Sequence, residues 1–315
     1  MKIVIPGGTG HVGAVAERAF TAAGHSVVVL SRNPSRPNQV RWDGRTLGAW
    51  AAELDGCDVV LNLAGRSVSC RYTPENLRDM MDSRVLSTRV VGEAIARAER
   101  PPRVWLQAST ATIYAHTFGP PNDEHGLIGG TEPGVPEYWA YSVEIAKNWE
   151  REQAQADTPH TRKVALRSAM VMSPDRGGIF DYLSWLTRLG LGGPVAGGRQ
   201  YVSWIHDHDF TAALTHLITH EEHEGPINLA APNPLPQRDF ARTLRHAWHM
   251  PIGLPATRTM ATLGAYALRS DTELLLKSRR VIAARLPDAG FHFAHTDWND
   301  AARDLVRRVR AGRGR

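Results

Sequence analysis

Cysteine and long apolar runs are the scarcest features of this 315-residue sequence. The two cysteines, Cys57 and Cys70, form neither a CxxC pair nor the framework of a disulfide-rich domain. No apolar run approaches the roughly 20 residues of a membrane-spanning helix, and no signal peptide precedes the first predicted strand. These absences argue against a disulfide-stapled secreted scaffold and against a membrane protein. We therefore expect a cytoplasmic protein with no membrane partner.

Acidic residues are outnumbered by basic ones, which gives a formal net charge of +5. The densest basic stretch is the tail at 303–315, and it lacks the interleaved aromatic side chains that would stack on bases. We therefore expect no nucleic-acid partner. The positive charge is suited instead to an anionic cofactor and to a small polar or anionic substrate.

An apolar strand pattern at the N-terminus turns into a glycine-rich loop and then into a helical pattern. The first of three evenly spaced glycines allows a tight turn, the second allows close approach to a pyrophosphate, and the third allows the helix to pack on the strand. The N–H groups at the helix start attract that pyrophosphate. The pattern predicts a dinucleotide-binding loop made of Gly7, Thr9, Gly10, His11, Val12 and Gly13.

No carboxylate follows the second predicted strand, residues 26–30, where NAD enzymes carry one for the ribose 2′-hydroxyl. Ser31 and Arg32 stand there instead, with Arg36 close behind. A guanidinium pairs with a 2′-phosphate and a hydroxyl bonds to it. The predicted cofactor is therefore NADP(H). The alternative is that both arginines are solvated loop charges.

Strand and helix patterns alternate through the first half of the chain, which predicts an α/β fold with a Rossmann-type doubly wound parallel sheet. Further predicted strands lie at 40–42, 58–63, 104–106 and 163–166, and long helices at 75–100 and 137–156. The less regular second half predicts a smaller C-terminal substrate lobe, with helices at 179–189, 210–219, 236–248, 257–269 and 297–310. The expected boundaries are 1–168 for the NADP-binding domain and 169–315 for the lobe, with parts of 200–230 completing the sheet.

Several motifs resemble the extended short-chain dehydrogenase/reductases: the glycine loop, Asn-Leu-Ala-Gly at 62–65, Ala-Ser-Thr-Ala-Thr-Ile-Tyr at 108–114 and Leu-Arg at 166–167. Later motifs, among them Trp-Glu at 149–150, the run at 197–206 and Ala-Gly-Phe-His-Phe at 289–293, resemble one atypical branch. That branch is the YfcH-like family of NAD(P)-dependent sugar-nucleotide epimerases, with a C-terminal epimerase-associated segment. The resemblance implies a Rossmann fold that binds NADP(H). The further cofactor contacts assigned on these motifs are Leu63, Ala64, Gly65, Ser109 and Ser168.

The sequence departs from the family at its catalytic set. Such enzymes use a Ser or Thr to orient the reacting oxygen, a Tyr to move its proton, and a Lys four residues later to lower the pKa of that Tyr. Thr110 takes the hydroxyl position, but no Tyr-x-x-x-Lys exists, and Ile145 follows Tyr141 at that spacing.

Three interpretations of this departure stay open. Tyr141 and Lys147 can converge from one helix, although a spacing of six places them only on loosely neighbouring faces. A different acid or base can act, with Glu132, Glu137, Tyr138 and His206 as candidates. The aromatic residues of 138–149 can instead be helix-packing side chains and Lys147 a solvated charge.

The expected substrate pocket draws on loops at the mouth of the cleft. The predicted substrate-binding residues are Arg66, Tyr138, Arg199, Gln200, Ser203 and His206. The run His206-Asp207-His208-Asp209 contains metal-ligand types, but four consecutive residues rarely face one ion, so no metal is expected. Asp207 or Asp209 is interpreted as a helix N-cap.

The residues together predict an NADP(H)-dependent oxidoreductase or epimerase acting on a hydroxyl or carbonyl carbon of a small polar substrate. The alternative is a non-catalytic NADP(H)-binding redox sensor or regulatory protein, which would explain the missing Tyr-x-x-x-Lys without a substitute. The two long helices at 75–100 and 137–156 are where a homodimer would form by analogy with extended reductases.

Overall fold

The computed structural model describes residues 1–133, 135–267 and 272–313. Its centre is a seven-stranded sheet in the order β10-β6-β5-β4-β1-β2-β3, with every neighbouring pair parallel. This confirms the predicted α/β doubly wound architecture. The strands are β1 (Lys2–Pro6), β2 (Ser26–Ser31), β3 (Gln39–Arg41), β4 (Val59–Asn62), β5 (Val104–Thr110), β6 (Arg162–Ser168) and β10 (Gly225–Leu229).

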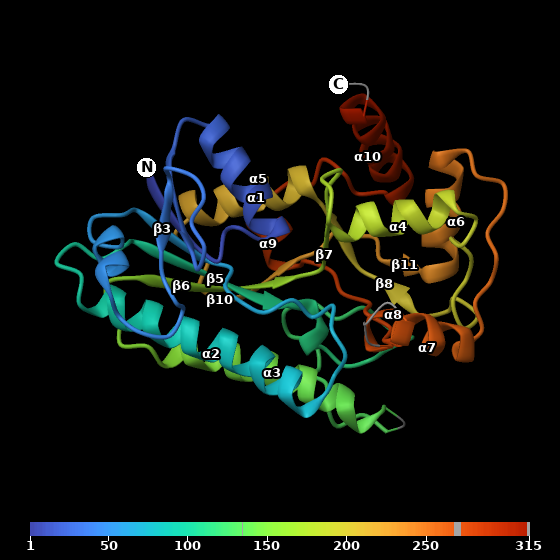
Figure 1. Ribbon diagram of the computed structural model, residues 1–315, viewed down its shortest axis with the longest axis horizontal. Coiled ribbons are helices and arrows are strands. Elements are labelled where there is room, and N and C mark those ends of the chain that lie inside the picture. The colour runs from blue at the N-terminus through green and yellow to red at the C-terminus, as the bar shows by residue number, and fades with distance from the viewer. Residues whose placement is uncertain (134, 268–271, 314–315) are drawn as a thin grey trace.

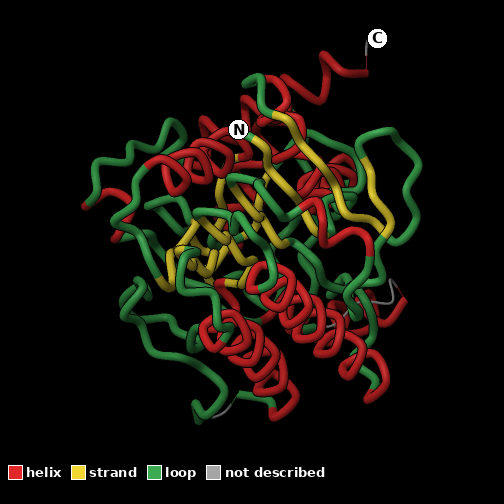
Figure 2. The backbone as a smooth tube through the Cα atoms, turned by 90° about the vertical axis from the view of Figure 1, so that its left-hand side faces the viewer, coloured by secondary structure: helices red, strands yellow, loops and turns green. Residues whose placement is uncertain are grey.

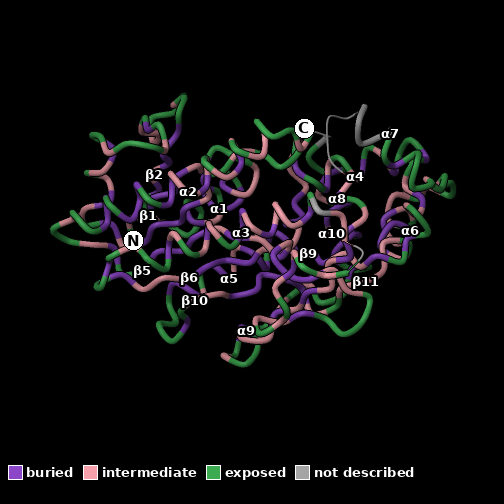
Figure 3. Tube along the Cα trace, turned by 90° about the horizontal axis from the view of Figure 1, so that it is seen from below, coloured by how far each residue is buried: buried purple, intermediate pink, exposed green. Residues whose placement is uncertain are grey.

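Helices cover both faces of this sheet, as Figure 1 shows. On one face lie α1 (His11–Ala22) and α5 (Asp207–Thr219), and on the other lie α2 (Pro74–Ala96) and α3 (Glu137–Gln155), which run side by side (Figure 1 and Figure 2). The apolar side chains of β1 divide between the two faces, since Ile3 and Ile5 belong to the core under α1 and Val4 belongs to the core under α2. A strand that is buried on both sides needs such a continuous apolar run. Figure 3 shows buried residues following the strands.

Several short elements lie outside the seven-stranded sheet. The 3-10 turns η1 (Ala49–Glu53) and η2 (Ala111–Ile113) follow β3 and β5. The strand β7 (Met170–Met172) pairs with β9 (Trp204–His206), and β8 (Tyr201–Val202) pairs with β11 (Leu235–Pro236). The lobe's helices, on the right of Figure 1, are α4 (Ile179–Arg188), α6 (Gln237–Trp248), α7 (Arg258–Ala267), α8 (Glu273–Leu276) and α10 (Trp298–Arg313). The short helix α9 (Arg285–Asp288) lies nearer the middle of the molecule and contacts β10 of the sheet.

A third apolar core holds the lobe together around Trp298, whose ring stacks on Phe240 at a centroid distance of 4.1 Å. The predicted helix at 75–100 ends earlier, at Ala96. Part of the predicted helix at 257–269 lies outside the described residues. Within the residues that the structure describes, no helix combines the length and apolar character needed to cross a membrane.

Candidate cofactor and active site

Two of the three motif glycines are required by the protein's own packing. Gly7 has φ +73°, and a Cβ on it would lie 2.6 Å from the Cα of Ala64 in the loop after β4. A Cβ on Gly13 would lie 2.3 Å from the carbonyl oxygen of Gly8, so only glycine lets α1 start this close to β1. The shape of the loop therefore requires glycine at both positions.

Gly10 is different, because nothing in the protein requires a glycine there. Its backbone angles, φ −74° and ψ 170°, suit any residue, and the nearest atom to an added Cβ is the Gly7 carbonyl oxygen at 3.8 Å. Gly10 is the N-cap of α1, and no side chain caps that helix. The exposed Thr9 stands beside it. The loop thus leaves an open cradle beside a helix N-terminus, which fits the diphosphate of a dinucleotide.

His11 forms a wall of this cradle. Its Nε2 is buried without a hydrogen-bond partner among the described residues, and a Cβ on Gly178 would lie 2.1 Å from that nitrogen. Burial lowers the pKa of His11. The neutral imidazole therefore packs against the start of α4 and closes the gap between the glycine loop and the lobe.

The arginines after β2 have different surroundings. Arg36 forms an ion pair with Glu17 of α1 at 2.8 Å, so its guanidinium is already held by a carboxylate. The hydroxyl of Ser31 accepts the N–H of Asn33 at 3.2 Å. Arg32 is exposed and lines a cavity of about 530 Å³.

Two further guanidiniums line the same cavity, Arg41 at the end of β3 and Arg45. Sequence reasoning missed both, although basic residues recur at 32, 36, 41 and 45. Asp43 also lies there, but its Oδ2 accepts the Thr46 hydroxyl and its Oδ1 accepts the Arg45 and Thr46 N–H groups. These bonds keep the pKa of Asp43 below its usual value, and they use its carboxylate within the loop. The cavity is therefore suited to an anion such as a 2′-phosphate.

The loop after β4 is fixed from below by buried amides. Asn62 donates to the Oε1 of Gln107 on β5 at 2.9 Å and accepts the N–H of Ala64 at 3.1 Å. The N–H of Leu63 bonds to the carbonyl of Pro6 on β1. Leu63, Ala64 and Gly65 are thereby held next to the glycine loop, as expected for a cofactor-contacting segment.

Thr110 and Tyr141 each carry a hydroxyl proton that no described residue accepts. The Oγ1 of Thr110 accepts the N–H of Thr112 at 3.1 Å and starts η2, which leaves its own proton to donate. Tyr141, half-exposed on α3, makes no hydrogen bond through its hydroxyl to the described residues. Lys147 does not converge on Tyr141, because six helical residues separate them by about 120° around the axis. Its Nζ instead pairs with Glu144 at 3.0 Å.

Two other acid–base candidates, Glu132 and Tyr138, form hydrogen bonds to other residues of the protein. The carboxylate of Glu132 accepts the N–H groups of His116 and Gly130; burial raises its pKa, but these bonds lower it by more, so the group stays ionised. The hydroxyl of Tyr138 bonds to Thr272 at 2.7 Å. The side chain of Glu137 lies outside the described residues.

A buried polar network that sequence reasoning missed lies under the ends of β5, β6 and β10. Glu150 of α3 accepts two bonds from Arg167, both at 2.8 Å, and one from the Ser109 hydroxyl at 2.6 Å. Arg167 also donates to the hydroxyl of Tyr114, which donates to Asn228 at 2.8 Å. Ser109 is therefore held by Glu150. The Trp-Glu and Leu-Arg motifs contain Glu150 and Arg167, but the sequence did not show that these two side chains form an ion pair.

Most predicted substrate ligands also have protein partners. Arg66 binds Asp79 and Asn76 of α2. Gln200 donates to the carbonyls of Val195 and Leu275. The Ser203 hydroxyl lies within hydrogen-bond distance of the carbonyl oxygens of Arg279, at 2.8 Å, and Val281, at 3.1 Å. Arg199 is exposed, with its guanidinium 5.9 Å from the ring of Phe118. Ser168, predicted for the cofactor, bonds to the carbonyl of Leu166.

Leu275, Arg279 and Val281, which accept three of these bonds, belong to a C-terminal segment that reaches the carboxyl end of the sheet. Lys277 donates to the carbonyl of Thr112 at 2.8 Å, and Arg279 donates to the hydroxyl of Thr112 at 3.0 Å. Glu273 accepts the hydroxyl of Ser142 on α3 at 2.6 Å. Burial lowers the pKa of Lys277. These residues were absent from the sequence prediction, because the segment is more than 130 residues away along the chain.

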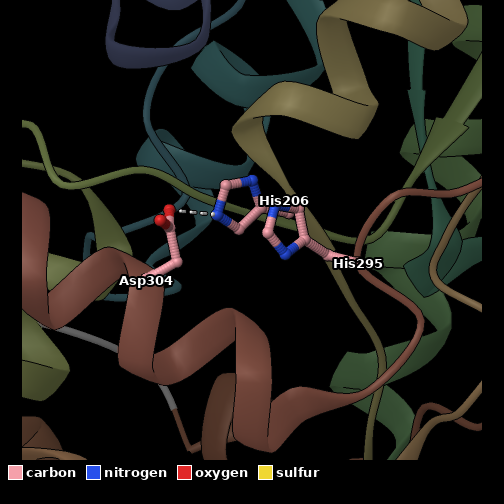
Figure 4. A group of neighbouring side chains, drawn as sticks. All are labelled: His206, His295 and Asp304. Atoms are coloured by element: carbon pink, nitrogen blue, oxygen red, sulfur yellow. Dashed lines mark hydrogen bonds and ion pairs between the residues drawn. The ribbon is translucent and has the colours of Figure 1, made fainter.

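His206 lies in a separate cluster between β9, α5 and α10 (Figure 4). It is 1% exposed, its Nε2 faces Asp304 at 3.2 Å, and its ring stacks on His295 at 3.7 Å. Its Nδ1 accepts the N–H of His208, so His206 is the N-cap of α5. The prediction that Asp207 or Asp209 is the cap was therefore wrong, since both lie in the first turn.

His206, His295 and Asp304 together offer three metal-ligand types. Because the Nδ1 of His206 accepts a backbone N–H, its Nε2 carries the proton in the neutral ring and has no lone pair for a metal. Burial lowers the pKa of His206 to about 4, which keeps this ring neutral. The arrangement is that of a hydrogen-bonded helix start.

Comparisons with known proteins bear on this geometry. Residues 3–230 match the NAD dependent epimerase/dehydratase family. The chain belongs to that family. Residues 266–305 match a domain of unknown function, DUF1731, and this match includes the segment that contacts Thr112. The epimerase resemblance inferred from the sequence is thus confirmed at the family level.

Individual members of the family match over nearly the whole chain. Human epimerase family protein SDR39U1 is 28% identical over 314 residues, which span 97% of this chain and 100% of that protein. Epimerase family protein YfhF of Bacillus subtilis is also 28% identical, over 97% of this chain and 98% of that protein. A crystal structure of human SDR39U1 isoform 2 with NADPH has a TM-score of 0.85 at 27% identity, covering 98% of this chain and 99% of that one.

Proposed function

We propose that this protein is an NADP(H)-dependent oxidoreductase or epimerase that acts on a hydroxyl or carbonyl carbon of a small polar substrate. The observation that carries the proposal is Gly10, a glycine that the protein's own packing does not require, at an uncapped helix N-terminus. The presence of NADPH in the structure of human SDR39U1 supports the same cofactor here.

The choice of NADP(H) over NAD(H) depends on the cavity beside β2 and β3. Arg32, Arg41 and Arg45 line it, and its one carboxylate, Asp43, is occupied by the loop's own N–H and hydroxyl groups. A 2′-phosphate meets donors there without a competing free carboxylate. Arg36 is less suited to bind this phosphate because its guanidinium already forms an ion pair with Glu17.

The bound cofactor would exchange a hydride between its nicotinamide C4 and the substrate carbon. Thr110 has a hydroxyl proton available to orient the reacting oxygen. Tyr141 has a hydroxyl that can move the proton, because no described residue forms a hydrogen bond with it. The network around Glu150 and Arg167 keeps the ends of β5 and β6 rigid beneath these groups.

The alternative, a non-catalytic NADP(H)-binding sensor or regulatory protein, is favoured by Ile145. This buried apolar residue occupies the position where the catalytic lysine would stand, and Lys147 pairs with Glu144 instead. Membership of the YfcH-like branch, the domain boundaries, cytoplasmic localisation and a homodimer stay predictions.

The experiment that tests the proposal has two stages. Titration with NADPH and NADH, followed by nicotinamide fluorescence, comes first, and absence of binding would overturn the proposal. NADPH oxidation is then followed with a panel of aldehydes, ketones and keto sugars. Turnover that falls about 100-fold in Tyr141→Phe supports an enzyme with Tyr141 as its acid. Binding without turnover of any carbonyl supports the sensor.

A further inference from the structure

Among the residues that the structure describes, Arg84 of α2 is a buried cation without a carboxylate partner. It is 9% exposed, and the neighbouring groups that raise its pKa are the Tyr72 phenol and the Cys70 thiol, neither of them a carboxylate. Arg167 shows the usual solution for a buried arginine in this fold, because Glu150 pairs with it through both oxygens. An uncompensated buried charge is costly, and it is typical of sites that receive a ligand.

The guanidinium of Arg84 is fixed at the carboxyl end of β4. One nitrogen donates to the carbonyl of Arg66 at 3.1 Å and another donates to the carbonyl of Met80 at 3.0 Å. A Cβ on Gly65 would lie 3.2 Å from its Cζ, so Gly65 leaves the space that the guanidinium fills. Two of its five N–H donors are thus used on carbonyls, and the other three, which no described residue accepts, have capacity for a ligand.

Arg84 also lies against the face of α3 that carries Tyr141. Its Cζ is 4.8 Å from the ring centroid of Trp149, which follows Ile145 by one turn, as Ile145 follows Tyr141. Burial lowers the pKa of Arg84 to about 10, so it remains a cation at neutral pH. A positive charge therefore reaches, from α2, the region where a lysine at position 145 would have provided one.

The sheet order indicates which end of the cofactor this charge faces. The glycine loop follows β1, and β1 lies between β2 and β4. The arginine-lined cavity after β2 and β3 would hold the adenosine side. The carboxyl end of β4, with Arg84, therefore lies on the opposite side of the diphosphate, toward the nicotinamide.

We propose that Arg84 is a positioning residue for the nicotinamide half of the dinucleotide, donating to the oxygens of its ribose and adjoining phosphate in place of the missing lysine. The inference rests on the proposed function. It assigns to Arg84 a contact with the half of NADP(H) that adenosine 2′,5′-bisphosphate lacks.

That difference gives the test. Affinities for NADPH and for adenosine 2′,5′-bisphosphate are measured by titration for wild type, Arg84→Met, Arg84→Lys and Arg32→Ala, with Arg78→Met, an exposed arginine of α2, as the matched control. We expect Arg84→Met to weaken NADPH about 10- to 100-fold and the bisphosphate less than twofold. Arg84→Lys should retain part of the NADPH affinity, and Arg32→Ala should weaken both ligands.

Other outcomes separate the failures. If Arg84→Met binds both ligands like wild type, or weakens both in parallel, Arg84 serves only to hold the loop and the inference is overturned. If wild type binds neither ligand, the proposed function fails with it. Thermal unfolding without ligand reports any loss of structure, and Arg84→Lys keeps the question testable if Arg84→Met does not fold.

Discussion

Alanine at Gly10 should leave the stability of the protein intact, whereas alanine at Gly13 should lower it. At Gly10 the added methyl group meets only the Gly7 carbonyl oxygen at 3.8 Å, and the backbone angles suit alanine. The free energy of unfolding should therefore stay unchanged or rise by up to about 1 kcal/mol, because alanine restricts the unfolded chain. At Gly13 the methyl group would lie 2.3 Å from a backbone oxygen, which should cost about 3 kcal/mol or more.

The affinity for NADPH should fall in Gly10→Ala even though the stability of that variant does not. The methyl group of Gly10→Ala projects into the cradle that the diphosphate would fill, and a misfit of about 1–3 kcal/mol weakens NADPH roughly 5- to 150-fold. Urea unfolding gives the stability, and nicotinamide fluorescence gives the dissociation constant. A Gly10→Ala variant with wild-type NADPH affinity would refute the assignment of Gly10 to close approach. An equally stable Gly13→Ala variant would refute the packing argument.

Three other substitutions test separate parts of the molecule. Arg32→Ala should weaken NADPH by about 5- to 30-fold and leave NADH unchanged, as two titrations would show. Glu150→Gln should reduce the free energy of unfolding by about 3–5 kcal/mol because the buried Arg167 loses its counter-charge; adding Arg167→Met should recover part of that loss in a double-mutant cycle. The pKa of His206 falls from 6.5 unfolded to about 4 folded, so the unfolded chain binds more protons between these values. Stability should fall by about 3 kcal/mol as the pH drops from 6.5 to 4, and His206→Asn, which keeps an N-cap acceptor, should flatten this dependence in urea unfolding.

The sheet and the glycine loop could be predicted because their signals are local. A strand, a glycine turn and a helix follow one another within the first 22 residues, and each position is constrained by its neighbours. Even here the sequence did not distinguish the glycines. The packing role of Gly7 is shown by the close approach of Ala64, 57 residues later along the chain, which the glycine pattern itself does not reveal.

The partners of charged side chains could not be predicted, because they come from distant elements. Arg36 lies beside Arg32 in the sequence, yet Glu17 of α1 pairs with Arg36. Glu150 and Arg167 belong to two motifs whose spacing does not show that a helix and a strand bring them together. The acid–base candidate Tyr138 likewise bonds to Thr272, 134 residues away along the chain.

At the carboxyl end of the sheet, hydrogen bonds join residues on both sides of the predicted boundary at 168. Tyr138 and Ser142, in the first turns of α3, bond to Thr272 and Glu273, and Lys277 bonds to the carbonyl of Thr112, 165 residues earlier. The segment that belongs to the DUF1731 match therefore fixes the helix that carries Tyr141 and the turn that follows Thr110. A change in this segment can alter the geometry of both hydroxyls without touching the glycine loop, so cofactor affinity and turnover should respond to it separately.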